Sequence, residues 1–354
     1  MIDPKSISTF NLSRLEKELF VLENANNLTK FHLENCKEYS SLMSKFGSVG
    51  DMALRVEDIP FLPVRLFKHM DLLSVPKSNV IKTMTSSGTS GHDVSRIYLD
   101  KETSALQVKV LSRIISDFIG PKRLPMLIID SKSIVSNRKN FSARTAGVLG
   151  FSMFGRDVEF ALNDDMSFNF EKVRSFITKY KDEDILIFGF TFIVWKHFVE
   201  ELEKFDEKLD ISNGILIHGG GWKQMEANSV SNEEYKKRIF NIASIKKIHN
   251  YYGMVEQTGS IFMECEYGFF HASTFSEILI RDHANYQSKD IGERGLIQLI
   301  SVIPKSYPGH SLLSEDIGEV YGIDNCKCGR KGSYFKVYGR MKNAELRGCS
   351  DTYT

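Results

Sequence analysis

Between residues 101 and 243 of the 354-residue chain, short apolar runs alternate with longer segments whose apolar residues recur every three or four positions. The runs predict strands and the periodic segments predict amphipathic helices. Such alternation is typical of α/β layering with at least part of the sheet parallel. The expected strands are 126–130, 158–162, 185–190 and 215–218, and the expected helices are 101–118, 143–154, 170–181, 192–205 and 232–243.

The segments on either side of this region have a different character. Residues 11–46 carry leucines and phenylalanines at spacings of three and four, which predicts helices with a break at 24–27. Beyond residue 245, short β-like runs predict a β-rich part, at 247–252, 260–265, 277–281, 295–302, 319–321 and 335–338. We therefore expect one large body over 1–338, with a helical part (1–80), an α/β part (81–245) and a β-rich part (246–338), followed by a short arm over 339–354.

Composition narrows the class of protein. A hydrophobic fraction of 42% and a charged fraction of 26% are those of a soluble globular protein. The formal net charge of +1 gives no field that would attract nucleic acid or a membrane surface. No apolar run approaches the roughly 20 residues that span a bilayer, and the first residues lack the charged-then-apolar order of a signal peptide. We expect a cytoplasmic protein.

Residues 85–91 form an uninterrupted run of small side chains, five of which carry hydroxyl groups. The run consists of Thr85, Ser86, Ser87, Gly88, Thr89, Ser90 and Gly91. Glycine allows close approach of the backbone to a ligand, and consecutive N–H groups with hydroxyls form a nest for an anion such as a polyphosphate. A mobile Ser/Gly loop explains the same residues, so the stretch alone leaves both interpretations open.

A second glycine run follows an expected strand. His218 ends the apolar run, and Gly219, Gly220 and Gly221 come directly after it. Ligands of open α/β sheets gather beyond the carboxyl ends of strands, where a backbone without side chains admits a flat ring or a phosphate. An ordinary tight turn rarely needs three glycines, so we favour a binding site. His218 is either a contact for a substrate carboxylate or a structural histidine.

Two further segments carry isolated carboxylates. Tyr252 ends the β-like run at 247–252, and Gly253 and Glu256 follow it. This combination suits stacking on a base and holding a magnesium ion. Asp316 precedes the run at 319–321, near an expected turn. A carboxylate there is either an acceptor for ribose hydroxyls or a capping residue. Neither segment is specific by itself.

The five cysteines are too few and too unevenly placed for a disulfide framework. Cys265, His271, Cys326 and Cys328 provide three thiols and one imidazole in two close-spaced pairs, a set that suits a tetrahedral structural zinc site. The C-x-C spacing is tighter than the usual C-x2-C. A β-hairpin turn with His271 elsewhere is the alternative, and both remain open.

In their order along the chain, residues 85–91, 219–221, 252–256, 316–318 and 339–340 are similar to the core motifs of adenylate-forming enzymes. That superfamily includes acyl-CoA ligases, luciferases and peptide-synthetase adenylation domains. The whole chain more closely resembles the LuxE family, the acyl-protein synthetases of bacterial luminescence. The residues that carry this second resemblance are 59–63 with Phe67 and Lys68, 220–223, 326–330 and 346–350.

The resemblance implies a fold and a set of roles. The fold would be the large α/β N-terminal domain of adenylate-forming enzymes over 1–338, with a strongly truncated C-terminal lobe. Residues 85–91 would bind the ATP phosphates, and residues 218–221 with Tyr252 and Gly253 would lie at the adenine. Glu256 would hold magnesium, Asp316 the ribose hydroxyls, and Arg340 would lie at the hinge near the ribose or phosphate. Relatives on the phenylacetate–CoA ligase branch carry similar Cys/His sets.

The sequence departs from the superfamily pattern in two places, one just after the Ser/Gly run and one after Arg340. Asp93 and Val94 stand where acyl-CoA ligases often have Pro-Lys. Only 14 residues follow Arg340, where a complete adenylating enzyme has a mobile domain of about 100 residues or more. The lysine that this domain supplies is therefore expected to be absent, and Lys223 or Lys342 are the candidates to replace it.

Cys349, near the end of the chain, is the expected acyl acceptor. A thiolate is a suitable nucleophile for a mixed anhydride, a terminal arm can carry it into a site, and Arg347 favours the thiolate form. An unused surface thiol is the alternative. In the LuxE family the acyl group rests on a near-terminal cysteine before a reductase takes it.

The resemblance therefore implies an ATP-dependent acyl-protein synthetase. Its substrate would be a long-chain fatty acid, and its partners would be an acyl reductase and an acyl-transferase or thioesterase in an oligomeric complex that makes aldehyde. A second hypothesis is an enzyme of the phenylacetate–CoA ligase type that passes its acyl group to coenzyme A or another small acceptor, for example in polysaccharide assembly. A third is a nucleotide-binding partner without catalysis.

Overall fold

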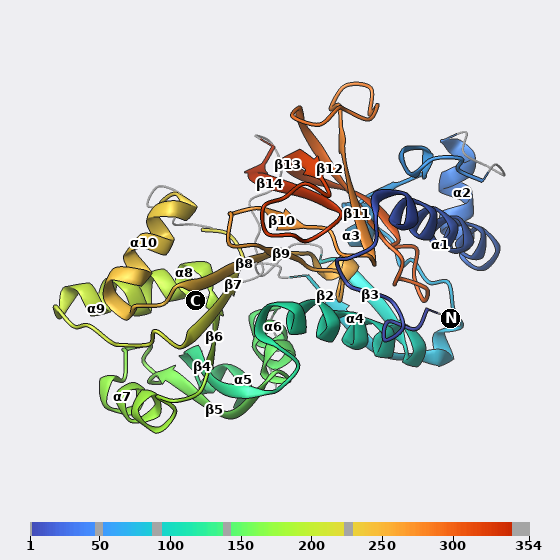
Figure 1. Cartoon of the computed structure of the whole chain (residues 1–354). Coiled ribbons are helices and arrows are strands. Elements are labelled where there is room, and N and C mark those ends of the chain that lie inside the picture. Colours follow the sequence, from blue (N-terminus) through green and yellow to red (C-terminus); the bar gives the residue numbers. More distant parts are fainter. Residues whose placement is uncertain (1, 47–51, 87–93, 137–142, 223–228, 342–354) are drawn as a thin grey trace. The chain divides into compact units, whose positions relative to one another are not determined.

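Two units make up the chain, one built from the described residues before Phe118 and after Tyr252, the other from Phe118–Tyr252. The structure is a computed structural model that describes residues 2–46, 52–86, 94–136, 143–222 and 229–341 (Figure 1).

The unit Phe118–Tyr252 contains a parallel sheet with the strand order β8-β7-β6-β4-β5. Its strands are β4 (Leu124–Ser131), β5 (Gly155–Leu162), β6 (Ile185–Phe190), β7 (Gly214–Gly219) and β8 (Lys247–Tyr252). The side chains of β6 and β7 are buried along their whole length, as both faces of a parallel sheet usually are. All four strands expected between residues 101 and 243 are confirmed, with ends shifted by up to three residues.

Helices connect these strands in the expected alternation. They are α5 (Ser133–Ser136), α6 (Ala143–Ser152), α7 (Phe170–Lys179), α8 (Thr191–Val194), α9 (Glu200–Lys204) and α10 (Asn232–Ala243). The helix expected at 192–205 occurs as α8 and α9 joined by the π-helical turn Trp195–Val199. Side-chain caps begin two of the helices, since Asn169 accepts a hydrogen bond from the Lys172 amide and Ser231 accepts one from the Glu234 amide.

The other unit is dominated by antiparallel strands in the order β11-β12-β13-β14-β10-β9. These are β9 (Phe262–Glu264), β10 (Phe270–His271), β11 (Ser276–Arg281), β12 (Arg294–Ser301), β13 (Ser311–Ile323) and β14 (Ser333–Arg340). The short β1 (Leu62–Pro63) pairs in parallel with β13, and β2 (Val80–Thr85) forms a separate hairpin with β3 (Arg96–Asp100). The β-rich character expected beyond residue 245 is confirmed.

The helices of this unit are α1 (Arg14–Asn35), α2 (Lys37–Lys45), α3 (Leu66–His69) and α4 (Lys101–Ile119), the last of which runs into the neighbouring unit. The helix break expected at 24–27 is wrong, because α1 continues through it. Asn24 donates to the Phe20 carbonyl within the helix, and the Asn26 side chain pairs with both backbone groups of Ala53. Their polar groups are therefore satisfied without ending the helix, and the break falls at Cys36 instead.

A buried cluster joins the helices of this unit to its strands. Tyr39 of α2, Phe67 of α3, Ile97 of β3 and Leu312 of β13 belong to it, together with Tyr307 from the segment before β13. These residues are distant in sequence, so the cluster fixes the position of α3 relative to the strands that carry several of the expected site residues.

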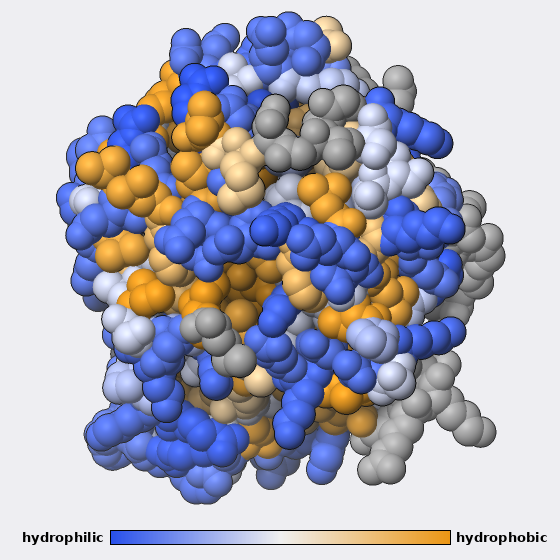
Figure 2. All heavy atoms as spheres, turned by 90° about the vertical axis from the view of Figure 1, so that its right-hand side faces the viewer, coloured by the Kyte–Doolittle hydropathy of each residue, from blue (hydrophilic) through white to orange (hydrophobic). Residues whose placement is uncertain are grey.

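The surface combines polar and apolar side chains. The face in Figure 2 is a mixture of hydrophilic and hydrophobic residues, and neither kind covers it alone. Within the part of the chain that the structure describes, none of the helices combines the length and the apolar character that a membrane crossing requires.

Candidate functional site

Glu256 lies in a short 3₁₀ turn, Val255–Gln257, and its side chain is only 6% exposed. Burial raises the pKa of this carboxyl, because desolvation disfavours the charged form. Hydrogen bonds from Ser95 and from the residue's own backbone amide act in the opposite direction, as do the positive charges of Lys68 and Arg340. A buried carboxyl with two cations nearby is a suitable place for a metal ion and an anionic ligand.

The backbone around Glu256 is held in place by buried hydrogen bonds. The Tyr307 hydroxyl donates to the main-chain carbonyl of Glu256 at 2.8 Å. The Gln257 side chain donates to the carbonyls of Leu299 and Gly309 at 3.0 and 2.9 Å. A Cβ on Gly309 would lie 2.3 Å from the Tyr307 ring and 2.9 Å from the Glu256 carbonyl oxygen. The turn is therefore packed too closely to shift without disturbing its neighbours.

Ser95 connects Glu256 with the Ser/Gly run. The Ser86 amide donates to the Ser95 carbonyl at 3.1 Å, and the Ser95 amide donates to the Ser86 hydroxyl at 2.9 Å. This pair extends the β2–β3 hairpin, in which Thr85 is opposite Arg96, to the base of the run. Ser87, Gly88, Thr89, Ser90 and Gly91 lie outside the described residues.

Asp316 and Arg340 are direct partners across two strands. They oppose each other in the β13–β14 register, and Arg340 Nε lies 3.8 Å from Asp316 Oδ1. The expectation that Asp316 lies near a turn is wrong, because it lies within the 13-residue strand β13. Pairing with β12 on one side and β14 on the other keeps this strand continuous. Neighbouring Glu315 accepts a 2.7 Å hydrogen bond from Arg65.

The second glycine run lies at the carboxyl end of β7, as expected. Gly219 pairs in register with Tyr251 of β8, and a Cβ on Gly219 would lie 2.2 Å from the Tyr251 ring. Glycine is therefore required at position 219, because any side chain there would overlap the Tyr251 ring. Gly220 has a φ of +80°, which favours glycine, whereas a Cβ on Gly221 would have open space around it.

His218 is buried directly before these glycines. Its Nδ1 lies 2.9 Å from the Thr191 hydroxyl, and its Nε2 has no hydrogen-bond partner among the described residues. Burial lowers the pKa of this imidazole to about 3. A neutral ring can exchange a hydrogen bond with a substrate but does not offer a positive charge to a carboxylate.

Tyr252 is the last residue of β8, and Gly253 comes directly after it. A Cβ on Gly253 would lie 3.1 Å from the Ile261 side chain, so close packing also explains this glycine.

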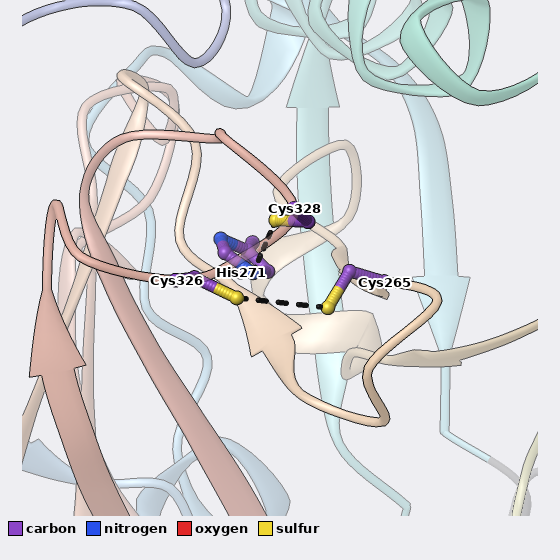
Figure 3. A group of neighbouring side chains, drawn as sticks. All are labelled: Cys265, His271, Cys326 and Cys328. Atoms are coloured by element: carbon purple, nitrogen blue, oxygen red, sulfur yellow. Dashed lines mark hydrogen bonds between the residues drawn. The ribbon is translucent and has the colours of Figure 1, made fainter.

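The four predicted metal ligands come together in the β-rich unit (Figure 3). Cys265 follows β9, His271 ends β10, and Cys326 and Cys328 lie between β13 and β14. All four ligand atoms lie within 4.8 Å of one another, with Cys265 Sγ 4.0 Å from Cys326 Sγ and Cys328 Sγ 3.3 Å from His271 Nε2. A tetrahedral zinc ion with bonds of about 2.0–2.3 Å separates its ligand atoms by roughly 3.5–3.8 Å, so this donor set fits. The alternative in which His271 lies elsewhere is wrong.

The surroundings of the cluster suit a metal centre. Burial lowers the pKa of His271 to about 4, which keeps its imidazole neutral for coordination. Burial also raises the pKa of Cys265 to about 12, so a metal ion would have to displace the thiol proton on binding. Arg330, two residues after Cys328, pairs with Asp117 at 2.9 Å and interacts with the Cys328 sulfur. A cationic neighbour offsets the negative charge that three thiolates bring to a zinc ion.

Lys223 and Cys349, both expected to act in catalysis, lie outside the described residues, as does Lys342. Sequence reasoning did not select Ser95, Tyr307 or Gln257, because a single serine, tyrosine or glutamine carries no pattern. Lys68 entered only as part of a family motif. Ser95, Tyr307 and Lys68 are identified by their contact or charge interaction with Glu256, and Gln257 by its buried hydrogen bonds to Leu299 and Gly309. These interactions arise only in the folded chain.

The fold is that of adenylate-forming ligases, as two solved structures illustrate. One is a 2-hydroxyisobutyryl-CoA ligase in an open conformation with 2-HIB-AMP and CoA, at a TM-score of 0.71 and 14% identity over 94% of this chain and 72% of that one. The other is the long-chain-fatty-acid-CoA ligase FadD1 from Archaeoglobus fulgidus, at a TM-score of 0.50 and 15% identity over 75% and 52% of the two chains. This confirms the expected fold class.

The model of the acyl-protein synthetase family LuxE matches residues 3–354, and the chain belongs to this family. It is therefore a ligase. Two curated relatives are long-chain-fatty-acid–luciferin-component ligases. The one from Vibrio harveyi is 23% identical over 332 residues, covering 91% of this chain and 84% of the relative. The one from Aliivibrio fischeri is also 23% identical over 332 residues, covering 90% and 84%.

Proposed function

We propose that this ligase activates a long-chain fatty acid with ATP as an acyl-adenylate and transfers the acyl group to its own Cys349. The observation that supports this most directly is the arrangement around Glu256. This buried carboxyl interacts with Lys68 and Arg340, while Arg340 also faces Asp316. Membership of the LuxE family and the names of both curated relatives supply the class of substrate.

In the first half-reaction an oxygen of the fatty carboxylate attacks the α-phosphorus of ATP. The bond from that phosphorus to the bridging oxygen breaks, and pyrophosphate leaves. Residues 85–91 would bind the phosphates through their N–H and hydroxyl groups. Asp316 would accept hydrogen bonds from the ribose hydroxyls, and Arg340 would neutralise nearby phosphate charge.

Other residues would hold the rest of the nucleotide and the acid. Gly219, Gly220 and Gly221, with Tyr252 and Gly253, would lie beside the adenine. His218 would exchange a hydrogen bond with a bound ligand through its unpartnered Nε2. Glu256 is the residue that would bind magnesium, whose chemistry is to neutralise charge on the phosphate oxygens.

In the second half-reaction the Cys349 thiolate attacks the carbonyl carbon of the acyl-adenylate. A thioester forms, the bond to the phosphate oxygen breaks, and AMP leaves. Arg347 would stabilise the thiolate. The arm proposed for 339–354 begins within β14, and its last 13 residues lie outside those described.

The experiment combines labelled fatty acid, ATP and magnesium with the purified chain. We expect pyrophosphate exchange and covalent label at the protein's own mass on a denaturing gel. Cys349→Ala should retain exchange and lose the label, whereas the matched control Cys36→Ala should keep both. Stable acylation of Cys349→Ala would overturn the assignment of the acceptor.

Transfer to coenzyme A or another small molecule is the second candidate, favoured by the fold shared with a 2-hydroxyisobutyryl-CoA ligase. Acyl-CoA without covalent label would support it. Formation of neither acyl-AMP nor a thioester would support a nucleotide-binding partner without catalysis. Under the main proposal the acyl group passes to an acyl reductase, and an acyl-transferase or thioesterase supplies the acid, in an oligomeric cytoplasmic complex.

We also propose that Cys265, His271, Cys326 and Cys328 bind a structural zinc ion. The converging ligand atoms and the buried, neutral imidazole support this assignment. Four protein ligands leave no open position for a substrate, which is the property of a structural site rather than a catalytic one. The cluster connects β9 and β10 with the segment between β13 and β14, so the ion would hold these strands together.

A further inference from the structure

Lys68 lies on the short helix α3 (Leu66–His69). Its neighbour Phe67 packs against Tyr307, the residue that holds the Glu256 backbone in place. The buried ring of Phe67 meets the Tyr307 ring edge to face, with centroids 6.1 Å apart. The hydroxyl of that tyrosine donates to the Glu256 carbonyl. Because Phe67 is fully buried in this contact, the short helix that carries Lys68 packs against the residue that holds the Glu256 backbone.

The segment before α3 is fastened to the strand that carries Asp316. Leu62 and Pro63 pair in parallel with Leu312 and Leu313 of β13, and the Val64 amide donates to the Leu313 carbonyl at 2.9 Å. These contacts attach the β1–α3 segment to the first residues of β13.

Arg65 adds an ionic contact to the same attachment, since its guanidinium bonds to Glu315, the residue before Asp316. The segment that carries Lys68 is thus attached both to the residue that holds the Glu256 backbone and to the strand that carries Asp316.

From this arrangement we infer that Lys68 is the lysine that neutralises the phosphates of ATP during adenylation. The inference rests on the proposed function. It places on α3 the lysine that assists adenylation, for which the sequence alone offered only Lys223 and Lys342. The charge interaction between Lys68 and Glu256 supports the same placement.

The chemistry explains why a cation is needed there. Attack on the α-phosphorus and departure of pyrophosphate move negative charge onto phosphate oxygens. A positioned ammonium stabilises that charge without taking part in bond making, and it transfers no proton. With Arg340 on β14 and Lys68 on α3, two cations from different elements would act on the phosphates, close to Glu256.

The test is ATP–pyrophosphate exchange by the full chain with myristate and magnesium. We compare Lys68→Met with Lys68→Arg, which keeps the charge, and with Lys77→Met, which removes an exposed lysine from the 3₁₀ turn Lys77–Asn79. Lys68→Met should lose about 100-fold in the maximal exchange rate, as expected when one preorganised group that stabilises transition-state charge is removed. Lys68→Arg should recover part of that loss, and Lys77→Met should stay within twofold of the original chain.

A binding measurement separates a local effect from misfolding. Lys68→Met should bind an acyl-sulfamoyl adenosine, which lacks the β- and γ-phosphates, as tightly as the original chain, and should bind a non-hydrolysable ATP analogue at least tenfold more weakly. Unchanged exchange by Lys68→Met, or equal weakening for both ligands, would overturn the role of Lys68 while leaving the proposed function intact. Absence of exchange in the original chain would overturn both.

Discussion

The hydroxyl of Tyr307 donates a 2.8 Å hydrogen bond to the main-chain carbonyl of Glu256, and both side chains are buried. The tyrosine therefore holds the backbone of the proposed magnesium ligand and leaves the carboxyl for other partners. It also packs against Phe67 of α3. One phenol ring thus connects the position of Glu256 with that of Lys68.

Tyr307→Phe tests this connection, because it removes the hydroxyl and keeps the ring. We expect a loss of about 1 kcal/mol in the free energy of unfolding and a higher magnesium concentration for half-maximal exchange. Denaturant unfolding and a magnesium titration measure the two effects. The control is Tyr39→Phe, since the Tyr39 hydroxyl is buried and has no hydrogen-bond partner among the described residues. An equal shift of the magnesium midpoint in both variants would contradict a specific role for Tyr307.

Gly309→Ala should disturb the same turn from the other side. The added methyl group would overlap the Tyr307 ring and press on the Glu256 carbonyl, and overpacking of this kind costs roughly 1–3 kcal/mol. We expect lower stability together with weaker exchange. Gly150→Ala in α6 is the matched control, because a Cβ there meets nothing within 4 Å. In a helix that change should stabilise the protein by about 0.4–1 kcal/mol. A stabilised Gly309→Ala chain would refute the packing argument.

The proposed zinc site predicts one equivalent of zinc in protein purified without chelators. Cys326→Ser and Cys328→Ser should each lower the zinc content and the thermal midpoint, because a structural zinc ion contributes directly to folding. Removal of zinc by a chelator should lower the midpoint of the original chain and leave that of the variants almost unchanged. Elemental analysis and thermal unfolding provide the measurements. The site would be excluded if the purified protein contains no zinc and its thermal midpoint does not change on treatment with a chelator.

Stability should decline as the pH falls below about 6.5, and two stacked, buried histidines contribute to this decline together with His218 and His271. His32 Nε2 donates to the Pro304 carbonyl and its Nδ1 accepts from Ser74, while His310 Nε2 pairs with Thr29. Burial lowers the pKa of both rings, that of His310 to about 3. The unfolded chain therefore binds protons between about pH 6.5 and pH 3 that the folded chain does not, and unfolding becomes easier across this window.

His310→Gln should make this decline shallower in denaturant unfolding at several pH values. His283→Gln, at an exposed position, is the control and should leave the slope unchanged. If the stability of His310→Gln falls with pH as steeply as that of the original chain, the explanation by buried histidines is wrong.

The local pattern of apolar and polar residues was sufficient to predict most of the fold. The alternation between residues 101 and 243 predicted the parallel sheet, because buried parallel strands read as continuous apolar runs and amphipathic helices repeat every 3.6 residues. It failed at residues 24–27, where the asparagines resemble a helix end. Their side chains are satisfied by Phe20 and by Ala53, and the second of these partners is distant in sequence.

The sequence by itself determined the family, the order of the motifs and the four proposed metal ligands, because each depends on residue types at fixed spacings. Only the tertiary structure decided that His271 faces Cys328, that Asp316 lies within a strand opposite Arg340, and that Glu256 interacts with Tyr307, Ser95 and the charge of Lys68. These relationships join residues that lie tens to hundreds of positions apart. Burial, which sets their charge and their contacts, exists only once the chain has packed.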